Sequence, residues 1–592
     1  MTPPTRVSIL AVALLGIGLA AQAQALVNDD VLLQAMREEL GRAASQLRLE
    51  NLDKPFYIEA TVSDQETVSI AASFGALVRV DRERSRPLRV EVRVGSYELD
   101  SSEFVGSRSF YAQMMDVPRR LVVEDDALAL RHALWLAFDA AYKQALEQLA
   151  AKKAALQNKV VTEEVPDFSR EKPVTALAPR PPLGPEFAKW PDVVRRLSAI
   201  FREFPAIQDS SVQLAVRVGS RYYVTSEGTV LRQPNSLATL LVGATTQAPD
   251  GMQLKDFAPF FAASLDRLPP EAVLAAAVRS VGGQLTRLAA AAALEKYAGP
   301  VLFTGQAAAE LFAQLLAPQL SGHRPPLVGD ERMAAGMPTS ELAERINRPV
   351  LPAFLSVTDD PTQANFAGQA LMGTYAFDSQ GVPAQAVTVI DAGVLRTLLM
   401  SRRPRKEIPQ SNGHARATSY GGVAAQIGNL FVQARDGKDL HELKAQLLEE
   451  CKAAGLPHGL IVAKLDDSSL SGGDPSARGR RRPDAVAPPI VAYRVSVADG
   501  TEELVRGLSF GEISVRTLKE ISAAGSESFM DNRMATASAA GELMVVYGGY
   551  DGAGGVPAAV VAPAVLLPDL EFSRPAGPQQ KPAILPHPYF AR

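Results

Sequence analysis

One short segment combines residue types that could bind or transform a ligand. Ser411-Asn412-Gly413-His414-Ala415-Arg416 sets an imidazole and a guanidinium beside asparagine and glycine, which allow the backbone to approach a bound molecule closely. We expect Asn412 and Gly413 to present backbone groups and Arg416 to offer a fork for a carboxylate. The alternative is a structural turn that joins two strands. The candidate substrate- or partner-binding residues are Ser411, Asn412, Gly413, His414 and Arg416.

Other catalytic patterns are weak or missing from the sequence. No two of the six histidines stand close enough to form a local pair of metal ligands, and no HExxH, P-loop or dinucleotide-binding glycine pattern occurs. Gly507 to Gly511 matches G-x-S-x-G, but the residues before Ser509 form the second arm of a hairpin instead of a buried strand that opens into a helix. The residues alone therefore predict neither a zinc site nor a serine nucleophile.

Composition narrows the classes of function. The 592 residues include 61 Lys+Arg and 65 Asp+Glu, and the formal net charge of −4 leaves no basic surplus for a nucleic acid partner. The single cysteine, Cys451, excludes an internal disulfide framework and a Cys-rich metal site.

The first 25 residues resemble a secretory signal peptide. Arg6 supplies a positive start, Val7 to Ala20 are almost wholly apolar, and residues 21–25 (Ala-Gln-Ala-Gln-Ala) offer small-residue cleavage sites. The apolar run is shorter than the roughly 20 residues that cross a bilayer; the alternative is an uncleaved anchor. We expect a mature protein that starts near Leu26, is periplasmic or secreted, and has no stable membrane insertion after cleavage.

The remainder of the first half predicts an α+β domain over residues 26–297. Apolar spacing near 3.6 residues predicts helices from Asp30 (or Asp29) to Asn51, Asp126 to Gln157, Pro191 to Phe204 and Pro270 to Tyr297. Alternating apolar residues predict strands at Phe56 to Val62, Leu88 to Val94 and Val212 to Val218. The proline-rich residues 172–185 predict a linker.

Beyond Pro300 the sequence changes to short strands and turn signals. Asp378 to Gly381, Asp391 to Gly393 and Asp499-Gly500 predict a β-rich domain made of hairpins over residues 298–573. Residues 471–489 are rich in Gly, Arg and Pro and predict a disordered insertion, and the Pro-rich tail, residues 574–592, is expected to be poorly ordered. The fold class that follows is α+β with two domains in one subunit.

The C-terminal half resembles the TldD/PmbA proteins, which are also called modulators of DNA gyrase and are associated with metalloprotease activity. Four blocks carry the resemblance: Pro300 to Phe303 with the expected helix Gln306 to Leu316, Asp378 to Gln385 with Gly393 to Leu395, the loop Ser411 to Arg416, and Tyr493 to Gly507. The resemblance implies an α+β N-terminal domain and a β-rich C-terminal domain, assembled as a dimer that encloses a chamber where peptides are cleaved.

The resemblance also shows what this chain lacks. In the active branch of the family a His-Glu-x-x-x-His helix follows the strand that matches Val301 to Phe303, and a later cysteine completes a zinc site. Here the motif falls on Gly305 to Glu310, so both histidines are missing and Gln306 replaces the acid. An amide cannot serve as a general base near neutral pH. The late cysteine should follow an expected helix at Leu518 to Gly525, whereas Cys451 lies on an earlier helix and is expected in the core.

The resemblance therefore implies a member of the metal-free branch. Such a chain would be an exported subunit that forms a homodimer or a heterodimer with a TldD-like metallopeptidase and helps bind a peptide or unfolded-protein substrate, with zinc expected only in the partner. Two alternatives stay open. One is a peptidase with a non-standard site, in which folding joins Glu310 and His414. The other is a stand-alone peptide- or envelope-binding protein.

Overall fold

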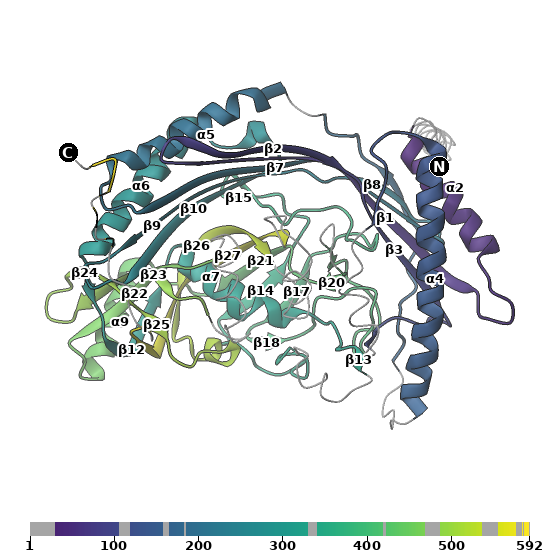
Figure 1. Cartoon of the computed structure of the whole chain (residues 1–592). Helices are drawn as coiled ribbons and strands as arrows, with labels where there is room; N and C mark the ends of the chain where they lie inside the picture. The colour runs from purple at the N-terminus through teal and green to yellow at the C-terminus, as the bar shows by residue number, and fades with distance from the viewer. Residues whose placement is uncertain are drawn as a thin grey trace, which may run out of the picture.

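Two curved sheets dominate the computed structural model, and the sheet from the N-terminal half arches over the C-terminal half (Figure 1). The structure describes residues 30–105, 119–157, 165–182, 185–328, 340–417, 422–467, 486–535, 555–575, 583, 585 and 587–590. The expected signal peptide, residues 1–25, lies outside these ranges. Within them, no helix has both the length and the apolar character that crossing a membrane requires.

The N-terminal sheet has nine strands in the described ranges, and its main path is antiparallel. In spatial order this path is β10 (Gln253–Ala262), β9 (Leu237–Gln247), β7 (Asp209–Thr225), β1 (Pro55–Ser73), β3 (Pro87–Val94) and β5 (Arg119–Arg120). The remaining strands are β2 (Ala76–Ser85), which pairs with β1, β8 (Val230–Pro234), which pairs with β7, and β6 (Thr175–Leu177), which pairs with β8.

The two faces of this sheet differ because side chains alternate along each strand. On β1, Ile58, Ala60 and Val62 join an apolar core with the helices α2 (Val31–Gln46) and α4 (Ala127–Gln157). Further along, a second core forms under α5 (Trp190–Ala199) and α6 (Glu271–Ala290). All four helices lie on the outer side of the arch, and the C-terminal half lies on the inner side (Figure 1). The polar residues of β1, such as Glu59, are therefore buried toward the C-terminal half.

The C-terminal sheet has twelve strands in the described part of the chain. Its path is β11 (Ala292–Ala293), β24 (Glu502–Arg506), β23 (Pro489–Ser496), β22 (His458–Leu465), β12 (Lys296–Phe303), β27 (Val556–Ser573), β21 (Asn429–Ala434), β14 (Leu355–Asp359), β17 (Val387–Asp391) and β18 (Val394–Leu395), with β25 (Ser509–Phe510) and β26 (Ala523–Ala535) on β27. Three neighbouring pairs, β11–β24, β12–β22 and β21–β27, are parallel. The expected β-rich domain is present, but hairpins alone do not build it, because segments distant in sequence form the parallel pairs. The small two-stranded sheets pair β13 (Leu327–Val328) with β4 (Phe104–Val105), β15 (Asn365–Phe366) with β16 (Gln369–Ala370), and β19 (Ala415–Arg416) with β20 (Ala424–Ala425).

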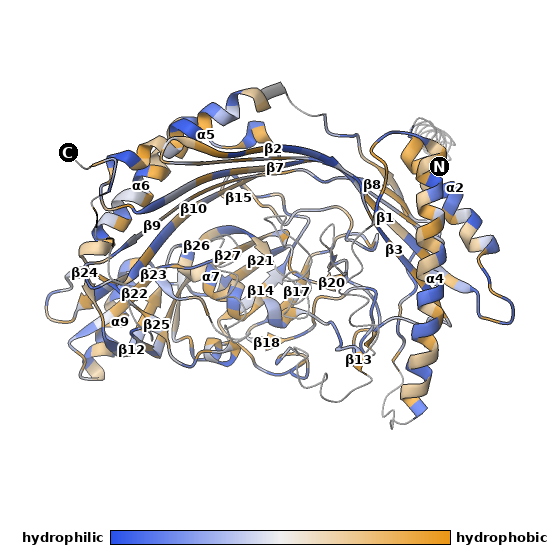
Figure 2. Ribbon diagram, in the orientation of Figure 1, coloured by the Kyte–Doolittle hydropathy of each residue, from blue (hydrophilic) through white to orange (hydrophobic). Residues whose placement is uncertain are grey.

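The central strand β12 separates two apolar layers. Val301 and Phe303 point into the larger core, which includes α7 (Gln306–Leu315). Leu302 points into a second core with α9 (Leu440–Ala453) and with Cys451, which is buried as expected. Apolar residues dominate the buried strands and the helix stripes over both sheets (Figure 2).

Three boundaries differ from the sequence-based expectations. The helix expected to reach Tyr297 ends at Ala290, because the chain then enters β11 and β12 and sheet pairing outweighs the helix propensity of alanine. The expected linker 172–185 contains β6. The helix expected at Leu518 to Gly525 is a 3₁₀ turn at Val515–Glu520 followed by β26, whose long antiparallel pairing with β27 keeps the chain extended.

The two segments expected to be disordered also need correction at their edges. Val486 and Ala487 of the expected insertion are buried, and β23 begins at Pro489; residues 471–485 lie outside the described ranges. In the tail, the rings of His587 and Tyr589 lie 5.2 and 5.5 Å from the ring of Phe74, between centroids. These aromatic contacts hold His587 and Tyr589 of the tail against the N-terminal sheet.

Candidate functional site

The degenerate motif, residues Gly305 to Glu310, lies where β12 ends and α7 begins. Gly305 occupies the N-cap with φ +59°, a backbone conformation that favours glycine. Gln306 Oε1 accepts a hydrogen bond from Leu465 N at 2.9 Å, which ties the start of α7 to β22. Ala307 to Ala309 are fully buried, and their small side chains pack into the large core of the C-terminal half. The segment is built as a tightly packed helix start.

Glu310 is the one ionisable side chain of this motif, and it is completely buried at 0% exposure. Its carboxylate accepts hydrogen bonds from Gln314 Nε2 at 2.6 Å and from Arg533 Nη1 on β26. The same Arg533 nitrogen lies 3.6 Å from Asp531 Oδ2. One guanidinium thus serves two carboxyl groups from two different elements.

The carboxyl groups of this cluster resist ionisation. Burial raises the pKa of Glu310 well above its usual value, and the negative charges of Asp467 and Asp531 add to that effect against the attraction of Arg533. Burial likewise raises the pKa of Asp531 to about 6. Because two close carboxyls share one cation, the pair retains a proton more readily than separate carboxyls would.

The residues at the motif do not fit a catalytic zinc ion. Such an ion needs about three protein ligands and one open position. Within the described ranges, no three His, Cys, Asp or Glu side chains are placed to hold a metal. Glu310 is engaged by the cationic Arg533, and Cys451 belongs to the core on the other face of β12. A guanidinium stands where a metal would have to approach the only acidic residue of the motif.

The predicted binding loop is present, but its histidine faces inward. His414 is fully buried; its Nε2 lies 3.0 Å from Asp359 Oδ1 and its Nδ1 lies 2.8 Å from the carbonyl oxygen of Asn412. Asp359 also accepts hydrogen bonds from Gly428 N. The Asn412 side chain bridges Leu398 O and Met400 N. The side chains of these loop residues therefore bind neighbouring segments of the chain.

Arg416 does not present a free fork for a carboxylate. Its Nη1 donates to Ile427 O at 3.1 Å, its Nη2 donates to Pro557 O at 2.7 Å, and the guanidinium lies 4.5 Å from the centroid of the Tyr375 ring. The Ser411 hydroxyl donates to Met400 O and accepts from Gly413 N. The structure also does not bring Glu310 and His414 together: the hydrogen bonds of the first run to Gln306, Gln314 and Arg533, and those of the second to Asn412 and Asp359.

The turn at Asp378 links this loop to the N-terminal sheet. Asp378 accepts backbone hydrogen bonds from Gln380 and Val382 through Oδ1 and from Ala415 through Oδ2, while burial raises its pKa to about 6. Arg221 of β7 donates to Ser379 O at 2.7 Å. One of the blocks that carry the family resemblance thus contacts the N-terminal sheet through Ser379, and a second block is bonded to it through Ala415.

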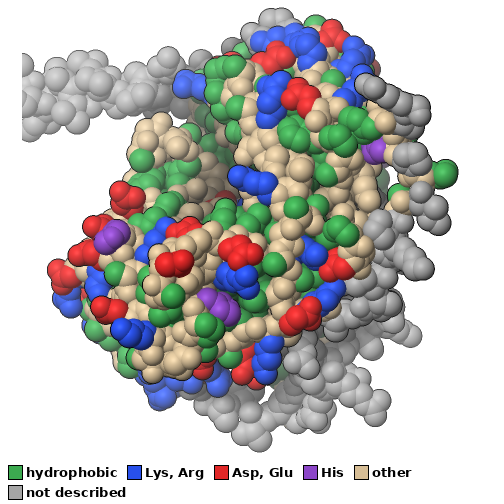
Figure 3. Space-filling view, turned by 90° about the vertical axis from the view of Figure 1, so that its left-hand side faces the viewer, with side chains coloured by type: hydrophobic (Ala, Val, Ile, Leu, Met, Phe, Trp, Pro, Cys, Tyr) green, Lys and Arg blue, Asp and Glu red, His purple; other side chains and the backbone are tan. Residues whose placement is uncertain are grey.

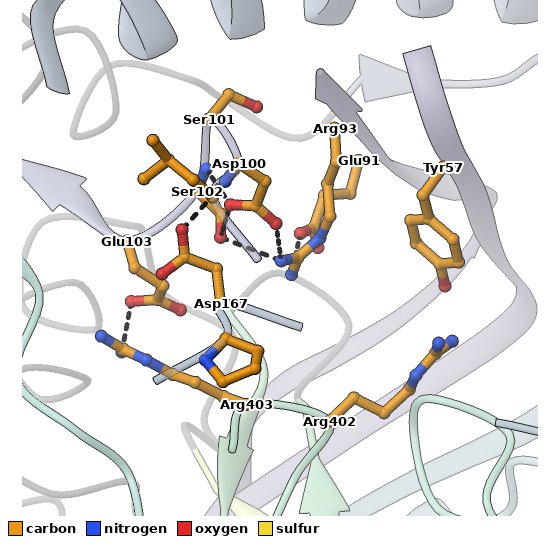
Figure 4. A network of polar contacts seen from close by, with 12 residues as sticks. Tyr57, Glu91, Arg93, Asp100, Ser101, Ser102, Glu103, Asp167, Arg402 and Arg403 are labelled. Carbon is orange, nitrogen blue, oxygen red and sulfur yellow. Dashed lines mark hydrogen bonds and ion pairs between the residues drawn. The ribbon is translucent and has the colours of Figure 1, made fainter. Parts of the chain in front are cut away.

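A larger buried network, which the sequence analysis missed, joins the two halves (Figure 4). The Phe168 ring lies between two guanidinium groups, with Arg93 of β3 at 3.8 Å and Arg402 at 4.0 Å from its centroid. Arg93 Nη1 donates to Asp100 at 2.7 Å, and Arg402 Nη1 donates to Glu227 at 2.7 Å. The available signals were the alternating charges of residues 89–93 and the Arg-Arg-Pro-Arg run at 402–405.

Electrostatics in this network favour the charged forms of Asp100 and Glu103, whereas burial raises the pKa of Glu91 beside Arg93. Burial by itself would raise the pKa of Asp100, but Arg93 and the Ser102 hydrogen bonds outweigh it and the pKa falls. The pKa of Glu103 falls in the same way because Arg403 offsets its burial. Burial and the neighbouring Arg403 charge lower the pKa of His323 to about 4. The network combines paired charges with a neutral imidazole.

Known proteins share both part of the sequence and most of the fold. Residues 295–472 match the family described as PmbA/TldA metallopeptidase C-terminal domain. Over 111 residues the chain is 29% identical to a metalloprotease of Archaeoglobus fulgidus; this match covers 19% of the chain and 24% of that relative's length. The chain thus aligns with about a quarter of that protein.

Three solved structures resemble the whole described architecture. TldE from Thermococcus kodakarensis matches with a TM-score of 0.55 and 13% identity, covering 91% of this chain and 100% of that one. A candidate modulator of a DNA gyrase from Thermotoga maritima matches with a TM-score of 0.53 and 15% identity over 91% and 99% of the two chains. One from Bacteroides thetaiotaomicron matches with a TM-score of 0.53 and 12% identity over 93% and 99%.

These matches confirm the expected two-domain α+β fold with a β-rich C-terminal region. At such low identity the structural likeness supports only the fold. The similarity to metallopeptidases rests on the sequence matches, which cover part of the chain. Residues 295–472 are thus similar in sequence to the PmbA/TldA metallopeptidase C-terminal domain, and the fold of the chain resembles that of TldE.

Proposed function

We propose that the chain is an exported, metal-free subunit that completes a peptide-binding chamber beside a metal-bearing TldD-like partner. The observation that carries the proposal is the contact of Arg533 with the buried Glu310. A cationic side chain that already neutralises the motif's carboxylate disfavours a divalent cation at the same place, because like charges repel at short range in a low-dielectric interior.

The chemistry of the other motif positions supports the same proposal. Gly305 has no side chain, and the amide oxygen of Gln306 accepts a hydrogen bond from the backbone of β22. Neither residue can activate a water molecule, because neither accepts a proton near neutral pH. Peptide hydrolysis in the cell would therefore require the metal and the base of another subunit, with this chain shaping the chamber wall and helping to select substrates.

Metal analysis and a cleavage assay test the proposal directly. The purified mature chain should contain no stoichiometric zinc and should not cleave unstructured peptides, whereas a mixture with a co-encoded homologue that carries His-Glu-x-x-x-His should cleave them. Cleavage should be abolished by a chelator. Stoichiometric zinc together with chelator-sensitive cleavage by the isolated chain would contradict the proposal.

A matched variant separates the proposal from the peptidase alternative. Glu310→Gln keeps the shape of the side chain and removes its charge. If the isolated chain cleaves peptides through a non-standard site at this cluster, the variant should lose that cleavage. If the proposal is right, the isolated variant and the wild type should both be inactive, and the mixture with the metal-bearing homologue should keep its rate.

Export is a separate part of the proposal, and it rests on the tripartite pattern of residues 1–25. Intact-mass measurement of the protein recovered from outside the cytoplasm should show a chain that begins near Leu26. A mass that includes the first 25 residues, or recovery only from the cytoplasm, would remove export from the proposal without affecting the metal-free assignment.

A further inference from the structure

Four buried nitrogen atoms lack acceptors near the seam where β4 of the N-terminal half pairs with β13 of the C-terminal half. They are Nδ1 of His323 and Nε of Arg324, Arg403 and Arg405, and no hydrogen-bond partner among the described residues reaches them. Arg403 and Arg405 are only 7% and 9% exposed. A buried donor without an acceptor costs free energy, so native structures place an acceptor beside almost every such group. Four of them in two short segments indicate an acceptor from outside the chain.

The neighbours of His323 determine which of its ring nitrogens donates. Its Nε2 lies 2.9 Å from Arg403 Nη1. Because a guanidinium group only donates hydrogen bonds, Nε2 accepts here. Burial and the charge of Arg403 lower the pKa of His323 to about 4, so the ring is neutral at pH 7 and carries its one proton on Nδ1. The unpaired Nδ1 is therefore a donor, as are the three Nε atoms.

The charge around these donors is positive. Burial lowers the pKa of Arg403 to about 10, and the charge of Arg324 adds to that effect against the attraction of Glu103. Burial and the nearby charge of Arg405 also lower the pKa of Arg324, although Asp167 and Glu103 oppose the shift. Each of these arginines is thus close enough to repel another. A water molecule would accept hydrogen bonds but leave the repulsion in place, whereas an anion relieves both.

The carboxylates of the same region are engaged by other cations. Asp100 contacts Arg93 at 2.7 Å (Figure 4), and Asp167 contacts Lys152 at 2.6 Å. Among the described residues no carboxylate forms an ion pair with Arg324, which donates to a backbone carbonyl. On the face seen in Figure 3, by contrast, Lys and Arg side chains lie among those of Asp and Glu.

Arg405 gives the cluster its connection to solvent. Its Nη2 lies 3.2 Å from Oε1 of Glu344, whose side chain is 90% exposed. An ion pair with so exposed a partner contributes little to stability. An anion of higher charge can therefore take the place of Glu344 beside Arg405.

We propose that His323, Arg324, Arg403 and Arg405 bind a free oxyanion of the phosphate or sulfate class at this seam. A tetrahedral dianion can offer an oxygen to each of the four donors, whereas a carboxylate has two oxygens and chloride is a single atom. Because the donors are buried, the site excludes a phosphate group that carries a bulky ester. The cluster shares no residue with the degenerate motif, so the proposal is independent of the proposed function.

Titration calorimetry of the mature chain with inorganic phosphate, at an ionic strength held constant with sodium chloride, tests the site. Arg324→Met and Arg405→Met should each weaken binding roughly 10-fold or more, because each removes a charge-assisted donor. Glu344→Gln should strengthen binding, because it removes the competing carboxylate. Arg279→Met, which removes an exposed arginine of α6 that pairs with Glu203, should leave binding unchanged. Phenyl phosphate should bind at least about 10-fold more weakly than phosphate.

The imidazole of His323 gives a second reading on the wild type, which guards against variants that misfold. In protein labelled with ¹⁵N-histidine and assigned with His323→Gln, saturating sulfate should raise the pKa of His323 by at least about 1, because a nearby anion favours the imidazolium. Sulfate suits this titration because it stays a dianion near pH 4.

The proposal is overturned if the folded wild type binds no phosphate at constant ionic strength, if both arginine variants bind it normally, or if sulfate leaves the titration of His323 unchanged. Phenyl phosphate that binds as tightly as phosphate would overturn the assignment to a free anion. None of these results bears on the metal content or cleavage that tests the proposed function.

Discussion

Two buried clusters of charge use the same residue types to opposite effect. At the degenerate motif, Glu310 and Asp531 share Arg533, and the pKa of each carboxyl rises. In the network around Phe168, Asp100 pairs with Arg93 and Glu103 pairs with Arg403, and the pKa values of both carboxyls fall. Glu91 shares Arg93 with Asp100, and its pKa rises. The direction of each shift depends on whether the cations and hydrogen-bond donors around a carboxyl outweigh its burial.

The two clusters differ in what their charges contribute to the folded protein. Paired charges in the Phe168 network hold two halves of the molecule together at neutral pH. The motif cluster instead sets two buried carboxyl groups against one guanidinium, so burial favours the retention of a proton there. Substitutions that change the ratio of cations to carboxyls should therefore act differently in the two places.

The largest effect is expected at Arg533. Arg533→Met removes the cation that contacts both Glu310 and Asp531 and should lower the free energy of unfolding by about 3–5 kcal/mol at pH 7, because the two buried carboxyls must then either carry an uncompensated charge or take up protons. The double variant Arg533→Met/Glu310→Gln should recover most of this loss. Chemical denaturation of both variants measures it. If the double variant is as unstable as the single one, the loss comes from packing and not from charge.

A smaller loss is expected at Arg402. Arg402→Met keeps most of the apolar bulk but removes the pair with Glu227, the hydrogen bonds to Ser169 O and the charge over the Phe168 ring. The free energy of unfolding should fall by about 2–4 kcal/mol. Arg402→Lys should cost less, since it keeps the charge. Equal losses in the two variants would show that the fork geometry, and not the charge, holds the network.

Among the described residues no carboxylate pairs with Arg416, and the effect of its removal should be smaller again. Arg416→Ala removes two hydrogen bonds to backbone carbonyls and the contact with Tyr375. We expect a loss of about 2 kcal/mol with little change in peptide binding by the assembled subunits. Thermal unfolding and a peptide-binding titration check this. A variant of normal stability that binds peptide poorly would restore the reading of this loop as a substrate contact.

Sequence patterns predicted the elements better than the contacts between them. The periodic helix that begins after Asp126 lies where the spacing indicates, and Asp126 caps it. The Ala-rich stretch beyond Ala290 misled the helix prediction, because its structure depends on strands β24 and β27, more than 200 residues away. The same distance hides Arg533 from any local motif around Glu310. The family resemblance located the degenerate position, but only the fold shows which residue fills it.

The smallest and most specific effect is a difference in pH dependence between the clusters. The pKa of Asp531 is raised from 3.8 to about 6, so its folded form favours the protonated state. The stability this gives is complete below pH 4 and is lost as the pH rises through 6. Asp531→Asn should therefore gain stability relative to the wild type, by up to about 3 kcal/mol, as the pH rises from 4 to 7. The pKa of Asp100 is lowered, so its stabilisation is present above its ordinary pKa and is lost on acidification. Asp100→Asn should accordingly lose stability at pH 7 and approach the wild type in acid.

Denaturant midpoints measured from pH 4 to 8 distinguish the two slopes. If both variants shift stability in the same direction with pH, the ratio of cations to carboxyls does not set the behaviour of these clusters.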